Sequence, residues 1–83
     1  MSTDSVLEVT MVISFTYTNG DCDIWCEEKG FGSTCFSNSC EFYDHEKRLI
    51  PVDKFELEAG KRVIAGFRDQ NKLGLVSYLQ LEK

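Results

Sequence analysis

Long apolar runs are missing from this 83-residue chain, and so is a positively charged start. A membrane-spanning helix needs roughly 20 consecutive apolar residues, so we expect no transmembrane segment. Residues 1–15 alternate between apolar and polar side chains, which is not the pattern of a signal peptide. The chain is therefore expected to be either cytosolic or the mature form of a secreted protein with an added start methionine.

Basic residues are scarce: nine lysines and arginines stand against fourteen acidic residues, which gives a net charge of −5. Proteins that bind nucleic acids gain most of their affinity from basic side chains on phosphates, so we expect no nucleic-acid partner. One proline and six glycines exclude a collagen-like or linker composition, and 42% hydrophobic residues are typical of a folded protein. We expect one domain over residues 1–83, with a core that is marginal for its size.

Helical periodicity is almost absent, and alternation takes its place. The odd positions from Leu7 to Tyr17 are apolar and the intervening ones mostly polar, which predicts a long strand with one buried face. Its length predicts a bend or bulge, or a strand that serves two sheets. Residues 55–59, 63–67 and 73–81 alternate in the same way, and shorter strands fit residues 40–44 and 48–52. We expect an all-β fold: a small antiparallel sandwich or barrel of about six strands. Its buried residues in the second half are predicted to be Phe55, Leu57, Val63, Phe67, Leu75 and Leu79.

Cysteine is absent outside residues 21–40, and four cysteines are concentrated there. Such a cluster in a short chain favours two disulfides, and bridges that join Cys22 and Cys26 to Cys35 and Cys40 would constrain the unfolded chain most. Each bridge would contribute about 2–3 kcal/mol. We therefore expect a cysteine-rich insertion at residues 21–40 that is closed by two disulfides, with no bound metal or cofactor.

Two other roles for the sulfurs stay open. Zinc is an alternative, with His45 as a replacement ligand, although the spacings C-x3-C and C-x4-C depart from the short zinc knuckle. A nucleophilic cysteine is disfavoured because the nearby carboxylates of residues 21, 23, 27 and 28 would raise the thiol pKa. Asn19, Asp21 and Asp23 also resemble the opening of a calcium loop, but the rest of that motif is missing.

The local structure of the cysteine-rich segment has two interpretations. Asp21 as an N-cap and Gly30 after the last turn would permit one short helix over residues 22–29. The alternative is an irregular loop. The sequence does not decide between them.

Three aromatic residues lie in this segment and are candidate binding anchors: Trp25, Phe31 and Phe36. Aromatic side chains on a rigid loop commonly anchor protein partners, and a flat ring also suits a sugar. We expect Trp25 to pack beside Cys26 in a small satellite core. Phe31, between Gly30 and Gly32, is the expected exposed tip. An acidic rim would select a basic partner surface, and it consists of Asp21, Asp23, Glu27 and Glu28.

No catalytic motif is present: His45 is the only histidine, and no nucleophile–base pair can be assembled around it. We therefore expect a protein that is not an enzyme. The leading hypothesis is a secreted, disulfide-stabilised recognition protein of the effector, toxin-like or defence kind that binds a protein target through its cysteine-rich loop. The alternatives are a carbohydrate-binding module and a cytosolic, zinc-stabilised interaction domain.

Overall fold

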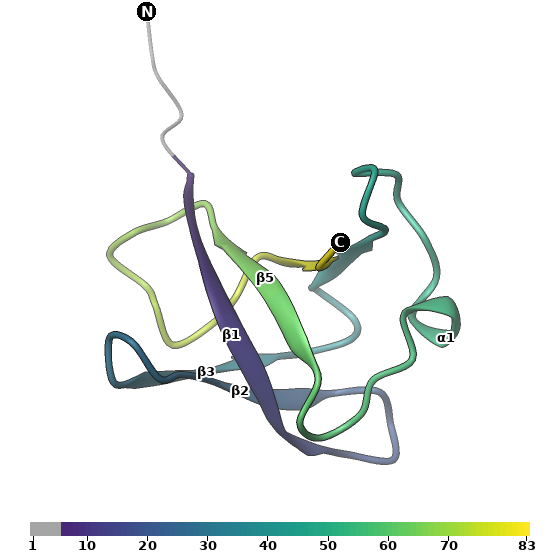
Figure 1. The fold of residues 1–83 in the computed structure, drawn as a ribbon, viewed down its shortest axis with the longest axis horizontal. Coiled ribbons are helices and arrows are strands. Elements are labelled where there is room, and N and C mark those ends of the chain that lie inside the picture. The colour runs from purple at the N-terminus through teal and green to yellow at the C-terminus, as the bar shows by residue number, and fades with distance from the viewer. Residues whose placement is uncertain (1–5) are drawn as a thin grey trace, which may run out of the picture.

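The computed structural model describes residues 6–83, which form one mixed six-stranded sheet and one short helix (Figure 1). The elements are β1 (Leu7–Thr16), β2 (Cys22–Cys26), β3 (Phe31–Cys35), β4 (Glu41–Tyr43), α1 (Val52–Phe55), β5 (Arg62–Phe67) and β6 (Tyr78–Leu81). The strand order is β3-β2-β1-β5-β6-β4, and only β4 and β6 pair in parallel. The expected small all-β fold of about six strands is confirmed, whereas the expectation of purely antiparallel pairing fails at β4.

A bulge divides the long strand β1. Ile13 pairs with Ile24 of β2, but the next paired residue of β1 is Phe15, which lies opposite Asp23. The extra residue reverses which side chains face the core, because successive side chains of a strand point to opposite faces. The odd positions up to Ile13 therefore point inward, while Phe15 and Tyr17 are exposed. The predicted bulge is confirmed, and the predicted burial of residues 15 and 17 is wrong.

The core lies on the concave face of the sheet and draws on every strand. Its fully buried members include Met11, Ile13, Phe67 and Leu79. Phe55 is also buried, and its ring packs edge-to-face on Phe42 of β4 at a centroid separation of 5.1 Å. Leu57 is only partly buried, and Leu75 is exposed, so the burial predicted for Leu75 is wrong.

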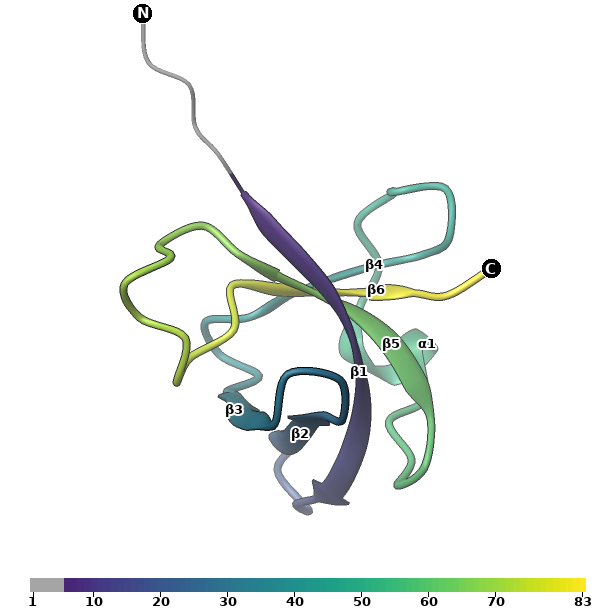
Figure 2. The ribbon, with the colours of Figure 1, turned by 60° about the vertical axis from the view of Figure 1, so that its left-hand side comes forward.

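The sheet curves so strongly that the hairpin of β2 and β3 runs crosswise to β1 and β5, as Figures 1 and 2 show. Both outer edges of the sheet carry backbone partners. Thr34 of β3 donates its N–H to the carbonyl of Gly74 and accepts from the N–H of Val76. On β4, the carbonyl of Phe42 accepts from the N–H of Ile50. These contacts partly cover both edges, which favours the side-chain faces of the sheet over its edges as a surface for a partner.

Two local predictions are corrected. Residues 22–29 form neither a helix nor an irregular loop: Cys22–Cys26 is a strand, and Gly30, at φ 71°, closes a tight turn by donating to the carbonyl of Cys26. Residues 55–59 were expected as a strand, but Phe55 ends α1. The helix follows Pro51, and Glu56 ends it in the left-handed conformation. This segment forms no strand pair, and it is held to the core by the buried ring of Phe55.

Candidate functional site

Three large aromatic side chains are exposed on the convex side of the sheet: Phe15 on β1, Trp25 on β2, and Tyr17 directly after β1. The exposed fractions are 57% for Phe15, 41% for Tyr17 and 45% for Trp25. Phe15 and Tyr17 meet edge-to-face with ring centroids 4.8 Å apart. We call these three residues the aromatic face. Two of them reach it only because of the bulge in β1.

Asp23 organises one side of the aromatic face. Its carboxylate accepts the Tyr17 hydroxyl at 2.8 Å and the Thr34 hydroxyl at 3.2 Å. The hydrogen bond to Asp23 raises the pKa of Tyr17, since it holds the phenol in its protonated form. Tyr17 is therefore a neutral, oriented ring at physiological pH.

The sequence assigned two of the three candidate anchors the wrong way round. Trp25 is exposed instead of buried, and its ring lies across Gly32, where a Cβ atom would come within 3.1 Å of Cε3. Phe31 is partly buried instead of exposed, and its ring packs against Phe67 at a centroid separation of 6.0 Å. Phe36 is exposed in the turn after β3, as an anchor would be. The position of Trp25 and Phe31 in the register of the β2–β3 hairpin decides which ring faces solvent, and the glycines beside Phe31 do not.

The expected acidic rim divides into two pairs. Asp21 accepts the backbone N–H of Ser37 at 2.8 Å, and this hydrogen bond lowers the pKa of Asp21. Asp21 therefore ties the turn before β2 to the turn after β3, while Asp23 orients Tyr17. Glu27 and Glu28 sit in the β2–β3 turn and form no ion pair with any residue in 6–83. They line a hollow of about 150 Å³ together with Thr10, Val12 and Arg62.

The expected disulfides are not present: all four cysteines are buried free thiols. Cys22 and Cys35 are directly opposed on β2 and β3, and the thiol of Cys35 also contacts that of Cys40. Cys26 lies four residues further along β2, which places it about 13 Å from Cys22 along the strand. Two bridges between the first and the second cysteine pair are excluded by this register. Residues 21–40 are consequently two strands of the sheet rather than an insertion closed by sulfur.

Burial and mutual contact make the thiols of Cys22 and Cys35 poor nucleophiles. The contact with Cys35 and burial both raise the pKa of Cys22 far above its ordinary value. For Cys35, the contact with Cys22 favours the thiolate, but the contact with Cys40 and burial outweigh it and raise the pKa. No three histidine, cysteine, aspartate or glutamate side chains among residues 6–83 are arranged to hold a metal ion. The zinc alternative therefore has no support in this geometry.

A concave site that the sequence did not reveal lies at the other end of β1. Its cavity volume is about 260 Å³, and its walls include Glu8, Tyr43, Lys47 and Arg68. These residues are far apart in the sequence and come together only because β1, β5, β6 and β4 are neighbours in that order. No spacing signal could have identified them.

Within residues 6–83 the structure contains no helix with the length and apolar character needed to cross a bilayer. No family model, curated protein or solved structure matches this chain. Geometry and chemistry alone therefore carry the functional conclusion.

Proposed function

We propose that this protein is a non-catalytic recognition domain that binds a basic protein surface through its aromatic face. The observation that carries the proposal is the exposure of Phe15, Tyr17 and Trp25 together on the convex side of the sheet. Small soluble proteins bury most of their large rings, and exposed clusters of them commonly mark interaction sites. The backbone partners on both sheet edges support recognition through side chains.

The charge around the aromatic face supports a basic partner. Glu27 and Glu28 have no ion-pair partner within residues 6–83, so both carboxylates are available to a cation. An arginine or lysine that stacks on an exposed tryptophan gains a cation–π contact of about 0.5–1 kcal/mol. Trp25 and the two glutamates lie on the same hairpin, so one basic side chain could use both kinds of contact.

A carbohydrate partner is the second candidate, because Trp25 is exposed and could stack on a sugar ring. A sugar chain favours a flat row of rings. The rings of Phe15 and Tyr17 meet at 66°, which does not provide such a row. The protein partner is therefore favoured.

Secretion stays a prediction. It rested on the two disulfides, and the thiols are free in this structure. The effector, toxin-like or defence roles also depend on that location, and the aromatic face does not require them.

Trp25 is the only tryptophan, so its fluorescence reports directly on the proposed surface. We would titrate the protein with arginine-rich peptides, with glutamate-rich peptides of equal length, and with neutral oligosaccharides. The proposal expects a response to the arginine-rich peptides that weakens with added salt. A response to oligosaccharides alone would favour the carbohydrate module, and equal responses to both peptides would contradict the role of charge.

Variants separate a specific surface from general attraction to an acidic protein. Phe15→Ala should weaken peptide binding about tenfold, which is the scale of one interface anchor. Leu49→Ala is the matched control, because Leu49 is an exposed apolar residue in the segment between β4 and α1. Equal loss in both variants, or no loss in Phe15→Ala, would contradict the proposal.

A further inference from the structure

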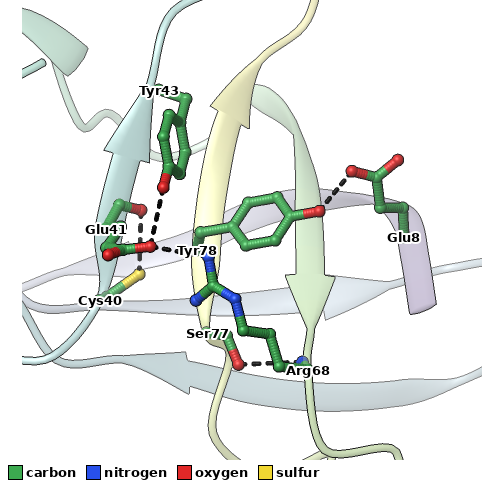
Figure 3. Close-up of polar contacts among 7 residues, drawn as sticks. All are labelled: Glu8, Cys40, Glu41, Tyr43, Arg68, Ser77 and Tyr78. Atoms are coloured by element: carbon green, nitrogen blue, oxygen red, sulfur yellow. Dashed lines mark hydrogen bonds and ion pairs between the residues drawn. The ribbon is translucent and has the colours of Figure 1, made fainter. Parts of the chain in front are cut away.

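Hydrogen bonds and ring contacts hold several side chains that line the cavity at the N-terminal end of β1, and Figure 3 shows these polar contacts. Tyr78 projects from β6 across β5 and donates its hydroxyl to Glu8 of β1. The guanidinium of Arg68 lies over the Tyr78 ring at 5.1 Å and pairs with Glu41 at 2.8 Å. Tyr43 donates to the same carboxylate at 2.8 Å and packs edge-to-face on Tyr78. This part of the cavity is preorganised for a ligand, because its side chains are already held in place.

Gln80 lies at the floor of this cavity, and its side-chain amide can form hydrogen bonds with a ligand. Only 7% of Gln80 is exposed, and it lines the cavity. Its side-chain amide makes no hydrogen bond to any residue in 6–83. The amide is not among the fully buried, unpartnered side-chain groups of the described residues, so it opens to the cavity and is a donor and acceptor available to a ligand.

The cavity has two acidic and two basic side chains at its border, so its net charge is zero. Two of these four side chains form no ion pair in the described part of the chain. Glu8 forms no ion pair within residues 6–83, and the Lys47 ammonium likewise makes no ion pair or hydrogen bond there. Glu41 and Arg68 neutralise each other. The free charges lie on opposite sides of the floor: β1 carries Glu8, and the turn after β4 carries Lys47. A ligand with no net charge but with two separated charged ends complements this arrangement.

From these three features we infer that the cavity binds a dipeptide-sized zwitterion. The ammonium end would meet Glu8, the carboxylate end would meet Lys47, and the central peptide amide would pair with the amide of Gln80. A side-chain amide and a peptide amide each present one acceptor and adjacent donors, so they can hydrogen-bond reciprocally. The volume of about 260 Å³ suits a small ligand better than a drug-sized one.

The test is a titration followed by ¹H–¹⁵N NMR at the side-chain amide of Gln80, with the dipeptide Ala-Val as the probe. Its N-acetyl form removes the ammonium, its C-terminal amide form removes the carboxylate, and 6-aminohexanoate lacks the central amide. The inference expects Ala-Val to shift the Gln80 signals and each analogue to bind about tenfold more weakly, the scale of one lost hydrogen-bonded contact. Analogues that bind as tightly as Ala-Val, or no shift with any probe, would overturn it.

Variants of the cavity give a second line of evidence. Gln80→Met removes the amide at similar length, and Lys47→Asn removes the ammonium with a residue that tolerates the left-handed backbone of position 47, at φ 68°. Each should weaken Ala-Val binding about tenfold, whereas Lys54→Gln on α1 should not. Thermal unfolding checks that each variant is folded. If Gln80→Met does not fold, Lys47→Asn and the analogue series decide, and unchanged affinity in Lys47→Asn would overturn the inference. Binding of basic peptides at the aromatic face is measured separately, so failure here leaves that proposal intact.

Discussion

The ring of Tyr78 occupies the space directly above Gly66. A Cβ atom at position 66 would overlap this ring, with Cζ as its nearest atom, far inside van der Waals contact. The two residues are register partners on β6 and β5, and Glu8 is the partner of Gly66 on β1. The missing side chain at position 66 therefore opens the path along which Tyr78 reaches Glu8.

Gly66→Ala should displace the Tyr78 ring and break its hydrogen bond to Glu8. Overpacking of this kind typically costs about 1–3 kcal/mol of folding free energy. Gly74→Ala is the matched control, since no atom lies within 4 Å of a Cβ at that position. Chemical denaturation of both variants measures the difference. Equal stability of the two variants would contradict the packing described here.

Tyr78 should make the protein sensitive to alkali. Burial, and next the hydrogen bond to Glu8, raise the pKa of Tyr78 to about 12. The ordinary tyrosine pKa is about 10, so the native state holds this proton more tightly than the unfolded state does. The resulting stabilisation is complete below about pH 10 and is lost as the pH rises towards 12. Tyr78→Phe should lose less stability than the wild type over that interval, as measured by denaturation at each pH. An identical pH dependence of the two proteins would contradict the shift.

Phe31→Ala should act on stability, and Trp25→Ala should not. Complete burial of a phenylalanine makes its removal cost about 3–5 kcal/mol, so partly buried Phe31 should lose on the order of 2 kcal/mol. Trp25 is exposed, and its loss should change stability by less than about 1 kcal/mol. Thermal and chemical unfolding of the two variants compare them. A larger loss in Trp25→Ala would mean that Trp25 belongs to the core, as the sequence had predicted.

All four cysteines should titrate as thiols once the protein is unfolded without reductant. In the native protein Cys40 should react first with a thiol reagent, because it borders a surface hollow of about 410 Å³ and the other three are more deeply buried. Alkylation followed by intact-mass and peptide analysis identifies the order. A native mass four hydrogens lower, with no alkylation, would establish two disulfides and restore the argument for an oxidising compartment.

The sequence by itself determined the class of fold, and particular residues show why. Alternation from Leu7 to Ile13 and from Val63 to Phe67 can bury one face only in a strand, because the period of two is a local property of the chain. The bulge in β1 was also predictable, since thirteen alternating residues exceed an ordinary strand. Net charge is likewise independent of how the chain folds, so the expectation of no nucleic-acid partner rests on the sequence alone and stays a prediction.

Tertiary structure alone decided the location of both candidate sites. Phe15 and Tyr17 continue the alternation of the buried residues, and only the pairing of β1 with β2 sets the position of the bulge that turns them outward. Phe31 and Trp25 exchange their predicted roles because each faces the side that its register dictates. The same register separates Cys26 from the other three cysteines, so two bridges cannot form together. Glu8, Gln80 and Lys47 meet across strands that are distant in sequence, and long-range pairing of this kind leaves no local pattern to read.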